Sequence, residues 1–353
     1  MRWKPFALLP VIAIALLGVS CQWQTPSIGE QIRDHYEQSF AGLSPAKQRH
    51  YATRLYRITG QPDYLPTLYD DLIGDAAMLN EDLQHLHRRE YRLQRAREIA
   101  HAYRDDTSKH RRRKQLLLAY DEIPFAKNLL YYLHKVDQLG LSGKPPFADT
   151  DNGLDYLRQV DFARFVLNPT VIRAYSPQLA NMVYYLHDLG IRDLRRDFRH
   201  RFRQVFPDQP PQAGPALNAR LYGMTHILIA ASGYYQRPIK RHDFPWIFDY
   251  FERHHREIIR FTKPDIYTEM ALGFLLAGED NHAVVHAVRS ALERVYDDRA
   301  RMIPSTRWGT DLDKGEHRNV LAIMLYHWPS RLHPGPDLSR YPGYHQRFAD
   351  TSQ

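Results

Sequence analysis

A helix that is apolar on every side constrains the fold of this chain more than any other feature of the sequence. Residues 221–231 are long enough for three helical turns, and only Gly223, Thr225 and His226 among them are neither aliphatic, methionine nor tyrosine. A helix without a polar face is buried on every side, so other elements must surround it. Gly233, just beyond the run, is typical of a left-handed cap and predicts that the helix ends there.

The same kind of helix returns along the chain. Five polar side chains mark the apolar helices, at steps of 53, 39, 43 and 48 residues: His134, His187, His226, Glu269 and His317. Amphipathic helices are predicted between them, at residues 191–206, 244–261 and 281–296. An apolar helix followed by an amphipathic one, again and again, indicates helical hairpins that stack side by side.

Strand signals are nearly absent from the sequence, which has no sustained alternation of apolar and polar residues. The predicted fold class is therefore all-α. The hairpins either close into an α/α toroid, with inner helices walled by outer ones, or form an open α-solenoid. Inner helices that are apolar all round favour the toroid, because an open solenoid leaves its concave helices with one wet face.

The amino terminus has the pattern of a secretory signal peptide. Arg2 and Lys4 are followed by an apolar run over residues 6–19, and the single cysteine of the chain comes at position 21. A basic start, an apolar run too short to span a bilayer and small residues before a cleavage site are typical of such signals. We therefore expect an exported protein.

Residues 17–21 resemble the lipobox of bacterial lipoproteins, although Gly18 stands where that family usually has leucine. The resemblance implies that Cys21 is lipidated and becomes the first residue of the mature chain. Gln22 after it implies, by the same resemblance, the outer membrane. The alternative is an ordinary cleaved signal with a chance cysteine.

No later stretch approaches the roughly 20 apolar residues of a membrane helix, so we expect a soluble mature part held by its lipid. The predicted segments are a signal peptide (1–20), a lipidated tether (21–27), an N-terminal helical region (28–115), a helical-hairpin domain (116–338) and a C-terminal tail (339–353).

The formal net charge of +8 suits a polyanion such as an acidic polysaccharide, a nucleic acid or an anionic membrane surface, and it is equally explained by solubility alone. The basic run at residues 110–114 is typical of a solvated helix start, so nucleic acid is not the expected partner. A lipidated Cys21 leaves no thiol for a disulfide, a metal or a nucleophile.

Polar residues on the buried helices point at a shared cavity if the fold is a toroid, which makes them candidates for chemistry. Histidine and carboxylate together can act as base and acid near neutral pH. The predicted catalytic residues are Glu316, His317, His226 and Glu269. The alternative for each histidine is a satisfied core side chain, and for Glu316 a helix cap.

Substrate binding is predicted for five further residues: Arg318, Asn319, Trp308, Tyr222 and Tyr235. Arginine can clamp a carboxylate or phosphate through two hydrogen bonds, and a sugar ring can stack on Trp308. The alternative for Trp308 is an anchor that pins its loop to the helices beneath, and the alternative for the tyrosines is the core.

Metal and cofactor signals are poor. His282 and His286 have a spacing that could bind zinc, yet no glutamate motif accompanies them. No phosphate-cradling glycine loop and no nucleophile elbow occurs in the sequence. Neither a metal nor a cofactor is predicted.

Residues 222–338 contain the segments Thr-His, Tyr-Tyr-Gln, Lys-Pro-Asp, Leu-Ala-Gly and Lys-Gly-Glu-His-Arg-Asn. In these they resemble an uncharacterised family of bacterial domains, a resemblance that implies no activity. The toroid architecture is itself similar to that of polysaccharide lyases and many glycosidases, but fold likeness does not establish function.

The expected function is that of a cell-envelope lipoprotein that binds or processes a polysaccharide, acidic polymers included, as a lyase or a glycoside hydrolase. The alternative is a non-catalytic helical-repeat lipoprotein that docks a protein partner in envelope assembly or secretion. The first hypothesis requires the four predicted catalytic residues to converge within about 10 Å, because they must reach one substrate atom.

Overall fold

The computed structural model describes residues 26–341 and 343, and helices account for most of this range. Within it, the only β structure is an isolated bridge between Asp297 and Met302. The predicted all-α class is confirmed. The predicted signal peptide (1–20), Cys21 and most of the tail lie outside the described residues.

The α-helices follow one another with short connections. They are α1 (Ile28–Ser39), α2 (Pro45–Thr59), α3 (Leu65–Gln84), α4 (Arg89–His101), α5 (Ser108–Leu118), α6 (Ile123–Gln138), α7 (Thr150–Gln159), α8 (Phe162–Val166), α9 (Pro169–Asp188), α10 (Arg195–Val205), α11 (Pro215–Ala231), α12 (Pro245–Phe261), α13 (Pro264–Leu276), α14 (Ala283–Val295) and α15 (Leu312–Tyr326).

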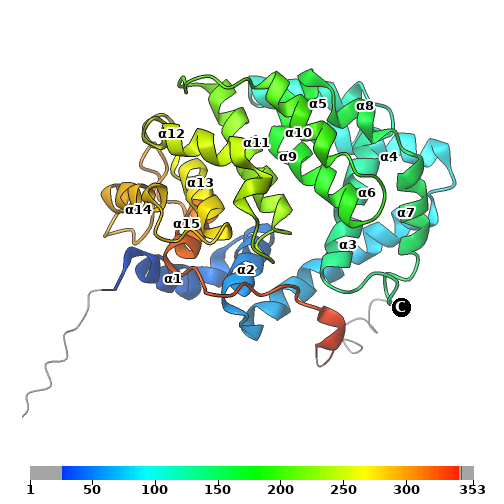
Figure 1. The fold of residues 1–353 in the computed structure, drawn as a ribbon. Coiled ribbons are helices and arrows are strands. Elements are labelled where there is room, and N and C mark those ends of the chain that lie inside the picture. The colour runs from blue at the N-terminus through cyan, green and yellow to red at the C-terminus, as the bar shows by residue number, and fades with distance from the viewer. Residues whose placement is uncertain (1–25, 342, 344–353) are drawn as a thin grey trace, which may run out of the picture.

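Seven of these helices pack in a series that we call the inner helices: α2, α3, α6, α9, α11, α13 and α15. Each contacts the next, and α15 contacts α2 as well as α13, so the two ends of the series meet. Figure 1 shows the amino-terminal helices α1 and α2 beside the helices near the end of the chain. Residues far apart in the sequence therefore face one another across the inner helices.

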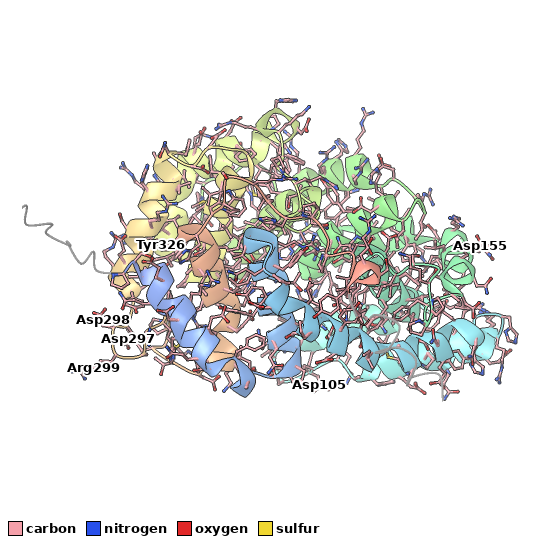
Figure 2. All side chains as sticks on the ribbon, turned by 90° about the horizontal axis from the view of Figure 1, so that it is seen from below. Asp105, Asp155, Asp297, Asp298, Arg299 and Tyr326 are labelled. Carbon is pink, nitrogen blue, oxygen red and sulfur yellow. The ribbon has the colours of Figure 1, made fainter. Side chains whose placement is uncertain are left out.

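The remaining long helices cover the inner ones from outside. Helix α10 packs on α9, and α12 and α14 pack on α13. In the view of Figure 2, α1 lies beside α15, and the loop residues Asp297, Asp298 and Arg299 lie at the outer edge of that side. The three amphipathic helices predicted between apolar ones occur as α10, α12 and α14.

Glycines end four of the inner helices, as the sequence predicted. Gly140, Gly190, Gly233 and Gly278 follow α6, α9, α11 and α13 and all have positive φ angles between 63° and 76°. An L-residue with a side chain is strained in this left-handed region, whereas glycine is not. The glycine stops confirm the predicted carboxyl ends of these helices to within two residues.

Helix α15 begins five residues earlier than the predicted start at His317. Asp311 precedes it and its carboxylate accepts a hydrogen bond from the backbone N–H of Lys314 at 2.9 Å, which caps the helix. The cluster at residues 315–319 therefore lies in the first turns of a helix and not at its edge. Its side chains point from a rigid element, which suits a precise site.

The apolar helix α11 is enclosed as predicted, with α9 on one side and α13 on the other. Gly223 on α11 allows a close approach of α10, because a Cβ atom at this position would lie 2.3 Å from Cε2 of Phe202 and 3.0 Å from Cβ of Ser176. Both neighbours belong to the buried core. The lack of a side chain at residue 223 is thus a packing requirement.

Replacing Gly223 by alanine is expected to destabilise the protein by about 1–3 kcal/mol, because the new methyl group must displace a buried ring. Gly74→Ala is the matched control. Gly74 lies on the exposed side of α3, and a Cβ atom added there would have no neighbouring atom within 4 Å, so alanine should stabilise the helix by up to about 1 kcal/mol. Urea denaturation of both variants measures the difference, and equal effects would contradict this packing account.

After α15 the chain forms a strap, residues 327–341, that crosses the carboxyl ends of α2 and α6 (Figure 1). The backbone N–H of His333 donates to the carbonyl of Arg57, and that of Leu338 donates to the carbonyl of Leu139. The strap thereby covers one end of the inner helices. Among the described helices, none combines the length and the hydropathy needed to cross a membrane.

Candidate functional site

Two buried carboxylates lie on neighbouring inner helices. Glu269 on α13 and Glu316 on α15 are 2% and 0% exposed. Burial of an ionised carboxylate is costly unless it is hydrogen-bonded and neutralised, so the partners of each determine its charge. The partners are mostly histidines.

Glu269 is held as a carboxylate. The hydroxyl of Thr225 donates to its Oε2 at 2.6 Å, and Nε2 of His317 lies 3.4 Å from its Oε1. Burial alone would raise the pKa of Glu269, but the hydrogen bond from His317, the nearby His226 and the Thr225 hydroxyl lower it below its ordinary value of 4.5. We therefore take Glu269 as ionised at neutral pH.

Glu316 is shifted in the opposite direction. Its Oε1 lies 2.6 Å from Nδ1 of His50 on α2, and its Oε2 lies 3.4 Å from Nζ of Lys47. Burial raises the pKa of Glu316 above its ordinary value, and the nearby cations only partly offset this. A carboxyl group whose pKa is raised in this way can remain protonated and act as an acid.

His50 and His317 join the two carboxylates. Nε2 of His50 lies 3.2 Å from Nδ1 of His317, with the ring centres 5.1 Å apart. Burial and the surrounding cations, Arg54 first among them, hold the pKa of His50 well below 6.5, so its imidazole is neutral. We call the continuous chain of Glu316, His50, His317 and Glu269 the relay.

The proton count of the relay follows from these contacts. In the arrangement in which Glu316 carries a proton and each imidazole carries one, Glu316 donates to Nδ1 of His50, whose Nε2–H then donates to His317. The Nε2–H of His317 in turn faces ionised Glu269. Moving one proton along every link leaves Glu316 ionised and Glu269 protonated. The relay can therefore pass a proton between two helices without changing its net charge.

His226 adds a base beside the relay. Its Nδ1 lies 3.1 Å from the side-chain oxygen of Asn181 on α9, so the ring donates there and carries its lone pair on Nε2. That Nε2 lies 3.9 Å from Oε1 of Glu269. Burial lowers the pKa of His226 and keeps the ring neutral. An oriented neutral imidazole is the usual general base of proton-transfer enzymes.

A cavity of about 260 Å³, which we call the inner cavity, adjoins the relay. It is bounded by α2, α3, α6 and α9 and by Tyr234 after α11, and both His50 and Asn181 lie on its wall. Tyr185 and Tyr234 close one side with a hydrogen bond of 2.8 Å between their hydroxyls. A small ligand in this cavity would thus reach the histidines of the relay from the side of His50.

The structure brings the four predicted catalytic residues together. Glu269 contacts His317 and His226 directly, and Glu316 reaches them through His50. The convergence that the sequence argument required is present. Of the other histidines that mark apolar helices, His134 lies on the wall of the inner cavity, whereas His187 is exposed and pairs with Asp188.

Two predicted binding residues are engaged elsewhere. Arg318 donates to the carbonyls of Ile303, Lys314 and Gly309, and buried Asn319 exchanges hydrogen bonds with the backbone of Ile303. Both side chains fasten the loop before α15 to that helix. Because their donors are used by backbone carbonyls, we leave them out of the site.

The three predicted aromatic residues have different surroundings. Trp308 is 70% exposed, so it does not anchor its loop to the helices and remains free to stack on a ligand. Tyr222 donates its hydroxyl to Asp265, and burial beside that carboxylate raises the pKa of the phenol. Tyr235 is buried against Trp328, and its hydroxyl has no partner among the described residues.

Helix α2 contributes site residues that were not predicted from the sequence. Its residues His50, Arg54 and Arg57 lie at i, i+4 and i+7, which places them on one face of the helix, and all three line the inner cavity. The stripe of basic residues beside the apolar positions of this helix was a signal in the sequence that could have identified them. No such signal marks Asn181, since one asparagine on an apolar helix is common.

Two other polar regions do not share this chemistry. A larger hollow, about 850 Å³, lies near Arg92 and Glu122, where the two side chains pair with each other and none of the predicted site residues is present. Glu252, Glu279 and His282 form the group of described residues that could hold a metal ion. The guanidinium of Arg241 already pairs with both of these carboxylates, at 2.8 Å and 3.0 Å.

Fold and site together define an all-α protein with a buried chain of acids and bases between its inner helices. The chain belongs to the family described as a domain of unknown function (DUF3541), whose model matches residues 25–350. The match extends the predicted resemblance, which covered residues 222–338, to nearly the whole described chain. Neither the curated proteins nor the solved structures contain a match.

Proposed function

We propose that this protein is a cell-envelope enzyme that processes a polysaccharide by proton transfer at the relay and His226. The observation that carries the proposal is the pair of opposed carboxylates, one with a raised and one with a lowered pKa, joined through two imidazoles. Groups whose environments push their pKa values apart are typical of acid and base pairs in active sites.

In this proposal the inner helices form a closed α/α toroid, supported by the contacts of α15 with both α13 and α2. Neutral His226 removes a proton from the substrate of a lyase or from the attacking water of a hydrolase, and protonated Glu316 supplies one to the leaving oxygen through His50. Exchange with solvent then returns both groups to their starting states. Both a lyase and a glycoside hydrolase need these two proton transfers. The partner-docking alternative leaves the relay without a role, and nothing in the arrangement favours it.

Product analysis tests this function. The full-length protein, purified in detergent, is incubated with polygalacturonate, polymannuronate, hyaluronan and a neutral glucan. A lyase creates an ultraviolet-absorbing unsaturated end, whereas a hydrolase creates reducing ends without that absorbance. New ends that vanish in Glu316→Gln would support the proposal, and no cleavage of any polymer class would contradict it.

We also propose that the protein is attached to the outer membrane through lipidated Cys21, as residues 17–21 suggest. Cells grown with labelled palmitate are expected to label the wild-type chain and not Cys21→Ser. The variant should move from the outer-membrane fraction to the soluble fraction, because an N-terminal acyl anchor is its only expected hold on the bilayer. A variant that keeps the label or stays with the membrane would contradict the anchor.

A further inference from the structure

Arg57 on α2 carries a buried guanidinium that has no counterion among the described residues. The residue is 2% exposed, and its Nε and Nη1 have no hydrogen-bond partner among the described residues. No described carboxylate lies within ion-pair distance of it, and burial lowers its pKa to about 9 with only Tyr56 opposing the shift. A buried unpaired charge is strongly unfavourable, so a guanidinium in this position needs an anion.

Arg57 lines the inner cavity, and so does Arg54, one helical turn away. The Nε of Arg54 is also buried without a partner, and its Nη1 reaches only the carbonyl of His50, at 3.4 Å. The other cations of this wall are already neutralised, since Arg49 and Lys135 both pair with Asp71. The guanidinium groups of Arg54 and Arg57 therefore remain available to a ligand.

We propose that Arg54 and Arg57 form an oxyanion subsite in the inner cavity, which binds the carboxylate of an acidic sugar residue. A guanidinium is suited to this role because its parallel N–H groups match the two oxygens of a carboxylate. The proposal rests on the proposed function and names its substrate class, an acidic polysaccharide. A subsite that holds one sugar residue also agrees with the volume of the cavity. At about 260 Å³ it is smaller than the roughly 300–1,000 Å³ of sites for drug-sized ligands.

The position of the subsite relates the carboxylate to the chemistry. His50, the member of the relay on α2, lies at i−4 from Arg54 on the same face of the helix. A sugar whose carboxylate contacts Arg54 and Arg57 therefore has its ring on the side of the cavity that His50 and Asn181 border. The subsite would orient one residue of the polymer against the acid and base groups.

Binding of small probes to the full-length protein in detergent tests the subsite. Calorimetric titrations use sodium glucuronate, glucose and inorganic phosphate at constant ionic strength. We expect glucuronate to bind and glucose not to bind. Loss of either guanidinium, in Arg57→Met or Arg54→Met, should weaken glucuronate binding by about 10- to 100-fold, the worth of a charge-assisted hydrogen bond. Equal binding of glucose, or binding of phosphate alone, would overturn the sugar carboxylate as the ligand.

The melting temperature gives a second readout that does not depend on the ligand. Arg57→Met should melt at a higher temperature than the wild type when no anion is present, since it removes an uncompensated buried charge. Arg95→Met is the matched control, because Arg95 pairs with buried Asp82 at 3.1 Å and its loss should lower the melting temperature. An Arg57→Met variant that melts below the wild type would show a structural role for the guanidinium and overturn the subsite.

Failure of the subsite and failure of the proposed function give different results. If glucuronate binds through Arg57 but no polymer is cleaved, the subsite stands and the enzymatic proposal falls. If a neutral polymer is cleaved through Glu316 while glucuronate does not bind, the enzymatic proposal stands and the subsite falls. His226→Ala should remove cleavage. It should leave glucuronate binding within about twofold, which is a change of well under 1 kcal/mol in binding free energy.

Discussion

His317→Ala is expected to lower the turnover of a cleaved polysaccharide by about 10²- to 10⁴-fold, the usual contribution of general acid–base catalysis. The imidazole is the link between the two carboxylates, because its Nδ1 meets His50 and its Nε2 meets Glu269. Without it His50 loses the hydrogen-bond partner that orients its ring for proton transfer from Glu316. The melting temperature should fall only modestly, since the side chain is 31% exposed and water can take its place as a donor to Glu269.

The matched control for this variant is His187→Ala. His187 is on the inner helix α9, but its ring is exposed and contacts Asp188. Its loss should leave turnover unchanged. Turnover measured by the release of new chain ends, together with melting curves, distinguishes the outcomes. A large drop in melting temperature for His317→Ala with proportionate loss of turnover would show that the ring supports the fold and takes no part in catalysis.

The same groups predict a bell-shaped pH dependence of kcat/KM. His226 must be neutral to accept a proton, so activity falls as the pH drops through its pKa, which burial places below 6.5. Glu316 must be protonated to donate, so activity also falls as the pH rises through its pKa, which burial places above 4.5. The limbs report coupled groups and not single residues. A profile without the alkaline limb in the wild type would contradict the role of Glu316.

The sequence was sufficient for the fold class and for most of the inner helices. The wholly apolar helix at residues 221–231 and its glycine stop depend on burial and local backbone geometry, both of which are readable from residue types. The start of α15 was placed too late because its first turns carry polar residues. The cap at Asp311 overrides that polarity by satisfying the exposed N–H of Lys314.

The site was predictable only in part, because its pairs are far apart in sequence. Glu269 and His317 occur on apolar helices where polar residues are conspicuous, and this alone singled them out. The contact of His317 with His50 joins residues 267 apart, and no local pattern encodes it. The surroundings of Arg318, a predicted ligand, could not be read from the sequence either. Its donors are used by loop carbonyl groups that only the folded structure brings near.

Removal of the Glu269 side chain should have the largest effect on stability. Glu269→Ala deletes a fully buried carboxylate and leaves the hydroxyl of Thr225 and the Nε2–H of His317 without an acceptor. Each buried donor left without its acceptor costs about 1–3 kcal/mol, so the loss of both should exceed the effect of either alone. Glu269→Gln keeps the shape and an acceptor oxygen, so it should cost about 1–3 kcal/mol, the range for hydrogen bonds to charged groups.

The pH dependence of this difference tests the charge of Glu269. Because the pKa of Glu269 is lower in the folded protein than its ordinary 4.5, its ionised form contributes stability that is fully present above pH 4.5. This contribution is lost as the pH falls through the folded-state pKa, where the carboxyl becomes protonated. The free energies of unfolding of the wild type and Glu269→Gln, measured by urea denaturation, should therefore converge toward low pH. A gap that stays constant or widens on acidification would show that Glu269 is already protonated in the folded protein, and the direction of the relay would then be reversed.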